Sequence, residues 1–320
     1  MTQRASMISV AGLAVMLACA MPAAAQYPTK PVRLIVASGA GGGLDFVARQ
    51  VAVPMSETLG QQVVVDNRAG ASGSIAAEVA SQAAADGYTL LFLSASLVVY
   101  GIVNKTRYDL ERDFAPVSQV AAAPYMLAVT PGLPVKTVQD LVAHAKANPG
   151  KLNYASTGNA SLAHLATELF AHQTGTRLTH IPFKGVGAAM PDMLAGRLHL
   201  AFLSMGSLYG HVRAGRLKAL AVAATARVKM APELPTMAEA GVPGYAVTQW
   251  HGMLAPRGTP RPIVSRLQQD IVKAVQRPEV ASRLALDGTD GIASTPEQFA
   301  AFLKSERARW TQAAKVANIQ

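Results

Sequence analysis

The chain has 320 residues, of which half are apolar and 15% are charged, with one cysteine and a formal net charge of +10. This apolar fraction excludes a disordered chain, and the lack of any Gly-X-Y or heptad period excludes a collagen or a coiled coil. At roughly 100–200 residues per domain, the length predicts two domains. Lysine and arginine are dispersed without a run of four, so we expect a basic surface that attracts anions generally and no nucleic-acid partner.

The first 25 residues have the pattern of a secretory signal peptide. Arg4 provides a basic start, residues 7–21 form an apolar stretch, and Ala23–Ala25 is a cleavage site of small residues. The apolar stretch is shorter than the roughly 20 residues that a membrane span needs, although a retained anchor is the alternative. We therefore expect a periplasmic protein whose signal peptide, residues 1–25, is cleaved after Ala25.

The mature chain alternates short predicted strands with predicted helices. Apolar positions between Leu44 and Leu59 recur at helical spacing and predict an amphipathic helix that Pro54 should bend. The alternation predicts an α/β protein with parallel sheets that helices cover on both faces. The strand candidates, each rich in Val, Leu or Ile and bounded by turn residues, are residues 32–37, 62–65, 89–93, 126–129, 152–155, 179–182, 198–203 and 218–223.

The C-terminal part of the chain changes character, because strands no longer separate its helices. Helices are predicted over residues 262–275, 278–286 and 295–317. Thr295 is the predicted N-cap of the last helix, and Gln298 completes a capping box with it.

Two proline-containing stretches interrupt the alternation of strands and helices, one near residue 125 and one near residue 245. We expect the chain to cross between two domains at these points. Residues 26–125 together with residues 246–320 would form domain 1, and residues 126–245 would form domain 2.

Glycine-rich turns are the main chemical signal. Residues 38–45 (Ser-Gly-Ala-Gly-Gly-Gly-Leu-Asp) and residues 154–161 (Tyr-Ala-Ser-Thr-Gly-Asn-Ala-Ser) each lead from a predicted strand into a helix. Glycine lets a ligand approach the backbone, and the unpaired N–H groups at a helix start favour an anion. Either turn alone could be an ordinary connection, but two at carboxyl ends of strands in different domains favour a binding cleft. A third run, Gly70–Gly73, is read equally well as a helix entry.

Motifs for cofactors, metals and catalysis are missing. Leu44 stands where a dinucleotide-binding fingerprint needs its third glycine, and neither a P-loop, a G-x-S-x-G nor an H-E-x-x-H motif occurs. The histidines have no metal-ligand spacing, and cleavage of the signal peptide removes Cys19, the one thiol. We therefore expect no cofactor, no metal and no enzyme activity. His164 is interpreted as a ligand contact or a helix-packing residue, and Trp250 as core or cleft wall.

A set of short motifs follows in order along the whole mature chain. They are Tyr27–Val36, Gly41–Gly42 with Asp45, Val63–Arg68, Asp86–Leu90, Asp113–Val117, Pro149–Tyr154, Pro182–Gly185, Leu234–Thr236, Glu239–Gly241 and Leu254–Pro256. Together they resemble the Bug (TctC-like) extracytoplasmic solute receptors of tripartite tricarboxylate transporters. The resemblance implies a two-domain periplasmic-binding-protein fold, type II-like with two crossovers, a small carboxylate bound in the cleft between the domains, and delivery to membrane permease subunits.

In that family, the ligand carboxylate is held largely by backbone amides and ordered water at two loops. The matching positions are Ala40, Gly41, Gly42, Gly43 and Asp45 in the first loop and Ser156, Thr157, Gly158, Asn159 and Ser161 in the second. Lys184, Leu203 and Ser204 are further candidate ligand-binding residues. The chain departs from the family pattern at residues 37–40, which lack the usual prolines and aromatic residue, at Ala160 in place of glycine, and at Leu203–Ser204 in place of Asp-Asn. The identity of the ligand therefore does not carry over.

Two other functions stay open. A secreted hydrolase or lyase could use the same cleft, and a ligand sensor could present the bound acid to a membrane signalling partner. We expect a non-catalytic, monomeric receptor whose domains close on an organic acid.

Overall fold

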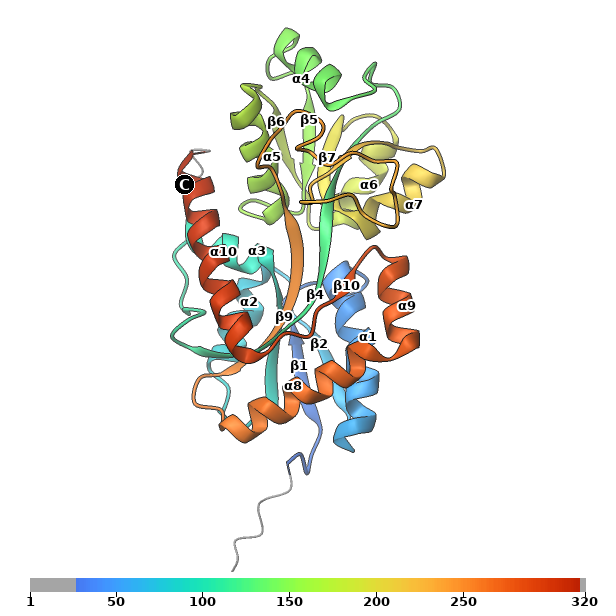
Figure 1. Ribbon diagram of the computed structural model, residues 1–320. Helices are drawn as coiled ribbons and strands as arrows, with labels where there is room; N and C mark the ends of the chain where they lie inside the picture. The colour runs from blue at the N-terminus through green and yellow to red at the C-terminus, as the bar shows by residue number, and fades with distance from the viewer. Residues whose placement is uncertain (1–26, 317–320) are drawn as a thin grey trace, which may run out of the picture.

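The computed structural model describes residues 27–316, so the predicted signal peptide lies outside the described residues. Two α/β lobes stand one above the other (Figure 1). The strands are hydrogen-bonded in the order β2-β1-β3-β9-β4-β7-β5-β6, with β10 and β8 also paired to β4. The expected two-lobed α/β fold is confirmed.

The lower lobe is built mainly from the two ends of the chain. Its parallel strands β1, β2 and β3 are flanked by helices from the N-terminal and the C-terminal segments (Figure 1). The elements are β1 (Val32–Val36), α1 (Gly43–Leu59), β2 (Val63–Asn67), η1 (Ala71–Gly73), α2 (Ser74–Ser81), β3 (Thr89–Ser94), α3 (Ala95–Val103), α8 (Arg261–Gln276), α9 (Pro278–Leu286), β10 (Asp290–Gly291) and α10 (Pro296–Val316).

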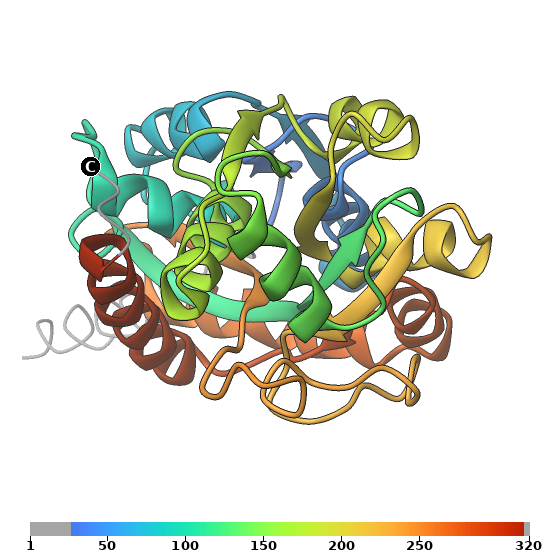
Figure 2. The same ribbon diagram turned by 90° about the horizontal axis from the view of Figure 1, so that it is seen from above.

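The upper lobe is built from the middle of the chain. Its strands β5, β6 and β7 are parallel. α9 and α10 lie on opposite sides of the molecule, and α10 extends upward to contact α5 of this lobe (Figures 1 and 2). The elements are α4 (Val138–Ala147), β5 (Asn153–Ser156), α5 (Leu162–Thr174), β6 (Thr179–Pro182), α6 (Val186–Leu194), β7 (Leu200–Ser204), α7 (Met205–Arg213) and β8 (Lys218–Val222).

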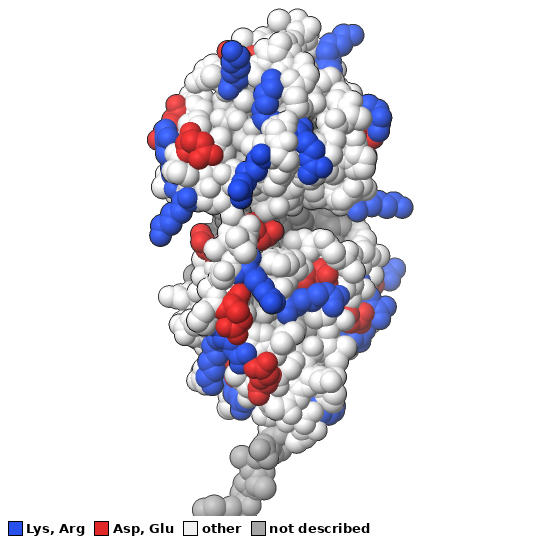
Figure 3. Space-filling view, turned by 90° about the vertical axis from the view of Figure 1, so that its right-hand side faces the viewer, with Lys and Arg blue, Asp and Glu red and all other residues white. Residues whose placement is uncertain are grey.

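Positive charge is concentrated on the upper lobe. On the face in Figure 3, Lys and Arg predominate above the waist, whereas both signs are mixed below it. Residues 126–245 contain 11 Lys or Arg and 5 Asp or Glu. The upper lobe is therefore the more basic half of the molecule.

Two long strands join the lobes. β4 (Phe114–Val129) pairs with β9 (Thr248–Pro256) as far as Pro124, and its last residues pair with β7 and β8 instead. Both pairings are antiparallel, and the β4–β9 ladder shifts register twice, between Pro116 and Ser118 and between Gln119 and Ala121. Such irregularities bend and twist a strand, which suits a strand shared by two differently oriented sheets.

Most strand and helix predictions are confirmed, including the capping box of α10, in which Gln298 N–H donates to Thr295 Oγ1 and Thr295 N–H to Gln298 Oε1. The prediction of parallel sheets is wrong for β4 and β9, which are antiparallel to their neighbours. Residues 126–129 are only the end of β4, and the sequence does not anticipate β9. Prolines and a run of alanines within β4 hide the alternation that identifies a strand.

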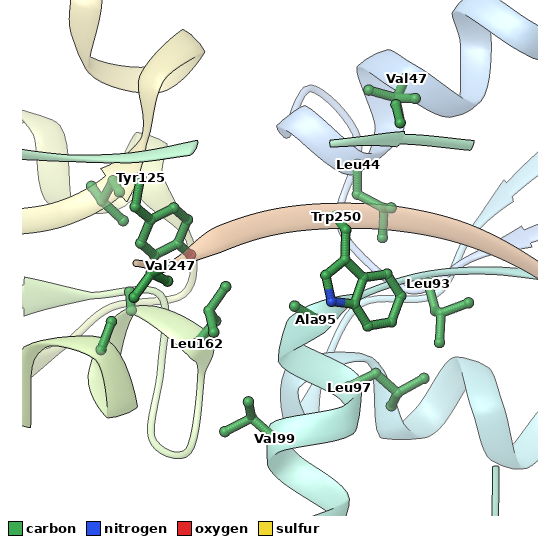
Figure 4. Packing of buried hydrophobic residues seen from close by; sticks show 14 of the residues in the cluster. Leu44, Val47, Leu93, Ala95, Leu97, Val99, Tyr125, Leu162, Val247 and Trp250 are labelled. Carbon is green, nitrogen blue, oxygen red and sulfur yellow. The ribbon is translucent and has the colours of Figure 1, made fainter. Parts of the chain in front are cut away.

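The apolar core continues from one lobe into the other. Leu162, at the start of α5, lies between Tyr125 and Val247, where the chain crosses between the lobes, and Ala95 and Val99 of the lower lobe (Figure 4). All five side chains are buried. Each Å² of apolar surface buried at this junction adds about 25 cal/mol to the stability of the folded state. This burial holds the lobes in the observed arrangement.

A buried carboxylate fastens α10 to β9. Glu306 Oε2 accepts hydrogen bonds from the indole N–H of Trp250 at 2.8 Å and of Trp310 at 3.0 Å. Both tryptophans are fully buried. Trp250 is therefore a core residue, one of the two interpretations that the sequence left open.

Acid should destabilise the fold through His251. This side chain, 4% exposed, lies on β9 against Phe92, and burial lowers its pKa to about 4. Below pH 6.5 the unfolded chain binds a proton that the native state does not, so the free energy of unfolding should fall from pH 6.5 towards pH 4. At pH 4.5 the loss due to this residue should be about 2–3 kcal/mol.

Urea unfolding of the wild type and His251→Gln at pH 7.5 and 4.5 checks this. The difference in stability between the two proteins should shift in favour of the variant at pH 4.5. Parallel pH dependence in both proteins would show that His251 does not carry the effect.

Candidate functional site

Strand direction places the glycine-rich turns on facing edges of the two lobes. The carboxyl ends of the parallel strands β1, β2 and β3 lie at one edge, and those of β5, β6 and β7 lie at another. Hydrogen bonds join the two edges: Ser72 Oγ donates to the Asn159 carbonyl at 3.5 Å, and Leu162 N–H donates to Ser96 Oγ at 3.4 Å. Ligands of open α/β sheets bind at such edges.

The first loop exposes Ala40 to Gly43 around a buried carboxylate. Asp45, 3% exposed, accepts hydrogen bonds from Gly41 N–H at 2.9 Å, Asn67 Nδ2 at 2.9 Å and Arg49 Nε at 3.0 Å. Burial opposes its ionisation, but these bonds outweigh burial and hold the pKa of Asp45 below its usual value. Asp45 therefore braces the loop from within.

This brace leaves a defined set of donors in the first loop. Gly41 N–H is taken by Asp45. Within residues 27–316, the N–H groups of Ala40, Gly42 and Gly43 have no hydrogen-bond partner. These three donors at the start of α1 suit an anion, because N–H groups there are unpaired and the helix dipole favours negative charge.

The second loop is also held by its own side chains. Ser161 is the N-cap of α5, and its hydroxyl accepts a hydrogen bond from His164 N–H at 3.3 Å. Ser156, 1% exposed, accepts from Gly158 N–H at 3.2 Å. The N–H groups of Thr157 and Asn159 have no partner in the described part of the chain. In this loop, backbone N–H groups are thus free to bind a ligand, whereas the hydroxyls of Ser156 and Ser161 already make hydrogen bonds within the protein.

Two histidines lie behind the second loop. His180 Nε2 is 2.6 Å from Ser156 Oγ, and His164 Nδ1 accepts a hydrogen bond from Ala160 N–H at 3.2 Å. The sequence offered His164 as a possible ligand contact and did not single out His180. The sequence separation between His180 and Ser156 does not predict their contact, because the two residues meet only when β6 pairs with β5.

The remaining predicted residues lie near the second loop. Lys184 is exposed after β6, where Phe183 N–H donates to the Ser156 carbonyl. Leu203 is 1% exposed in β7, and Ser204 is the N-cap residue of α7, with its hydroxyl 2.8 Å from that of Ser207. A direct role for these three side chains stays a prediction.

The third glycine run connects the two loops. Gly73 packs against Ala37 at the end of β1, and Ser72 reaches Asn159 of the second loop. Ala71 and Ser72 have φ of 45° and 51°, a left-handed conformation that is uncommon for residues other than glycine. The run is a helix entry, as one interpretation held, and Ser72 also brings it to the second loop. Ser96, which accepts a hydrogen bond from Leu162 N–H, is the residue of this region that the sequence did not indicate.

Two surface cavities lie away from these loops. One of about 270 Å³ lies between α3 and α10, and one of about 780 Å³ lies beside α4 and the end of α5. In the first, Arg307 is already paired with Glu111 at 3.1 Å. Neither cavity has the free backbone donors of the glycine loops among its lining residues.

Other kinds of site find little support in the described residues. Between residues 27 and 316, no group of three His, Cys, Asp or Glu side chains is placed to hold a metal ion. In the same range, no helix is both long and apolar enough to span a bilayer.

Two α/β lobes joined by crossing strands, with helix starts of both lobes meeting at glycine loops, define a solute-binding protein of the two-domain class. The family model for the tripartite tricarboxylate transporter family receptor matches residues 47–319. The chain belongs to this family of periplasmic receptors, which bind small carboxylates and work with transporter permeases.

Individual relatives agree with the family assignment. BugT from Bordetella pertussis is 37% identical over 306 residues, covering 95% of this chain and 92% of BugT. The structure of Rpa4515 from R. palustris with adipate has a TM-score of 0.87 at 36% identity, covering 92% of this chain and 99% of that one. MatC from Rhodopseudomonas palustris with bound malate has a TM-score of 0.83 at 30% identity, covering 90% and 99%.

The brace in the first loop can be tested without a ligand. Asp45→Asn removes the charge that Gly41, Arg49 and Asn67 share, and should lower the free energy of unfolding by about 1–3 kcal/mol. Glu57→Gln is the control on the same helix. Glu57 is exposed and paired with Arg277, and such a surface pair contributes about 0–1 kcal/mol. Urea unfolding at pH 7 compares them, and equal losses would contradict a bracing role for Asp45.

Proposed function

We propose that this protein captures a small organic carboxylate between its two lobes and delivers it to the membrane permease subunits of a tripartite tricarboxylate transporter. The observation that carries the proposal is the set of free backbone N–H groups at two helix starts, Ala40, Gly42 and Gly43 in one loop and Thr157 and Asn159 in the other. Such donors hold a carboxylate without a cationic side chain.

Relatives and surface charge support an anionic ligand. Two structures that resemble this one hold adipate and malate, both dicarboxylates. Two loops on facing edges suit a ligand with an acidic group at one end and further polar or apolar contacts at the other. The basic upper lobe (Figure 3) adds a general field that attracts anions.

We assign residues 26–125 and 246–320 to domain 1 and residues 126–245 to domain 2. In this division β4 changes its partners after Pro124, and β9 begins its pairing there with Thr248. Both crossing segments would act as the hinge for closure on the ligand. We also propose export with cleavage after Ala25 and a monomeric receptor.

A catalytic role is less well supported. The Ser156–His180 contact has the short distance of a nucleophile and its base. However, Ser156 is 1% exposed and its hydroxyl also contacts the Gly158 backbone. In the described residues no carboxylate hydrogen-bonds the His180 ring to orient it, so the contact fits a loop brace better than a hydrolase.

Isothermal calorimetry with adipate, malate and succinate tests the ligand class and the placement of the site. The wild type should bind at least one of these acids. Gly42→Asp adds a negative charge among the donors of the first loop, and at about 4 Å like charges repel by roughly 4 kcal/mol. Binding should weaken on the order of 100-fold or more, while the fold persists because a Cβ at Gly42 meets its nearest atom at 3.7 Å.

Gly132→Asp is the matched control, because it adds the same charge at a turn where a Cβ meets nothing within 4 Å. It should bind as the wild type does. Unchanged affinity in Gly42→Asp would refute the first loop as the anion site, and failure of the wild type to bind any acid would refute the ligand class.

Closure of the lobes can be tested at Gly206. This residue of α7 packs against Asp287 after α9, and a Cβ at Gly206 would collide with the Asp287 carbonyl and carboxylate. Gly206→Ala should therefore hold the lobes apart and weaken ligand binding at least tenfold. Gly210→Ala, on the same helix with no atom within 4 Å of its Cβ, should change neither the separation of the lobes nor the affinity for the ligand. Small-angle scattering measures the opening, and identical profiles for both variants would contradict this closed contact.

A further inference from the structure

We propose that His164 and His180 are positioning residues for the bound ligand: as a stacked neutral pair they fix both ends of the loop Ser156–Ser161 and so aim its free backbone N–H groups. This inference rests on the proposed function, in which the Thr157 and Asn159 N–H groups meet a carboxylate. It concerns how the donors are held, and neither histidine needs to touch the ligand.

The two rings form a close stack with Tyr154. The imidazole centroids of His164 and His180 are 3.9 Å apart, with only 7° between the ring planes. The Tyr154 ring lies 4.9 Å from His180 and 6.4 Å from His164. The three rings come from α5, β6 and β5, so the stack ties together the elements on which the loop is mounted.

Each ring holds one end of the loop. His180 Nε2 lies 2.6 Å from Ser156 Oγ, whose single proton can be donated to the Gly158 carbonyl at 3.0 Å. His180 is then the donor in this contact. At the other end, His164 Nδ1 accepts from Ala160 N–H, so its own proton is on Nε2. The pattern requires a proton on Nε2 of both rings and, because Nδ1 of His164 is an acceptor, a neutral His164.

Electrostatics favour the neutral state of both rings. Burial and the facing His164 ring lower the pKa of His180 to about 4, and burial lowers the pKa of His164 against the opposing effect of Glu168. The Glu168 carboxylate accepts the Tyr154 hydroxyl at 2.5 Å. Two imidazolium rings face to face would also repel each other.

The loop needs such support because part of it is strained. Ala160 has φ of 54°, a left-handed conformation that disfavours a residue with a Cβ. His164 meets this turn twice, through Nδ1 to Ala160 and through its own N–H to the hydroxyl of Ser161. Strain of this kind persists only where surrounding contacts fix the backbone.

Position-matched amide variants test the proposal. Asn places its amide near the Nδ1 position of histidine, and Gln places its amide near Nε2. His164→Asn and His180→Gln should therefore keep affinity for the best-bound acid of adipate, malate and succinate within about threefold of the wild type. The exchanged variants, His164→Gln and His180→Asn, should lose tenfold or more. If Asn and Gln act alike at each position, or if all four variants bind as the wild type does, the histidines do not position the loop.

A second measurement needs no ligand. In the whole exported protein at pH 7, nitrogen NMR of the histidines should find both rings neutral with Nε2 protonated. Hydrogen exchange at Ala160 should be slow in the wild type and His164→Asn but fast in His164→Gln. A charged ring, the other tautomer, or equal exchange in all three proteins would overturn the proposal. Absence of carboxylate binding by the wild type would refute the proposed function instead, and the NMR and exchange results would still decide whether the histidines hold the loop.

Discussion

The antiparallel pairing of β4 with β9 is the constraint on which the arrangement of the molecule depends. β4 belongs to the sheets of both lobes, and β9 links β4 to β3 in the lower lobe, so the orientation of each lobe depends on the same ladder. In the lower lobe, β3, β1 and β2 follow β9 on one side of this ladder, and in the upper lobe β7, β5 and β6 follow β4 on the other side. The buried contacts around Leu162 then hold the facing edges in register (Figure 4).

Internal braces behind both loops suggest why free backbone donors can serve as a binding surface. Asp45 holds the first loop through Gly41, and the stacked histidines contact the second at Ser156 and Ala160. A loop that is already ordered loses little conformational freedom when a ligand arrives, so more of the interaction energy appears as affinity. Ala71, Ser72 and Ala160 adopt the left-handed backbone conformation, and this ordered arrangement therefore includes some backbone strain.

The sequence predicted features that depend on local pattern, including most strands, the C-terminal helices, the capping box at Thr295 and the two glycine loops. It could not predict features that arise from pairing over long distances. Asn67 completes the cage around Asp45 from 22 residues away, and His180 reaches Ser156 only because β6 pairs with β5. Most of the long strand β4 was missed for a related reason, since Pro116 lies beside a register shift that only the pairing with β9 defines.

The carboxylate shared by Trp250 and Trp310 has a consequence for fluorescence. These are the two tryptophans of the chain, and both are buried in the lower lobe with their indole N–H groups on Glu306. Intrinsic emission therefore comes from the joint between β9 and α10, with no indole at either glycine loop. A change in emission on adding a solute would report movement transmitted along β9, and a solute that binds without moving this joint would be optically silent.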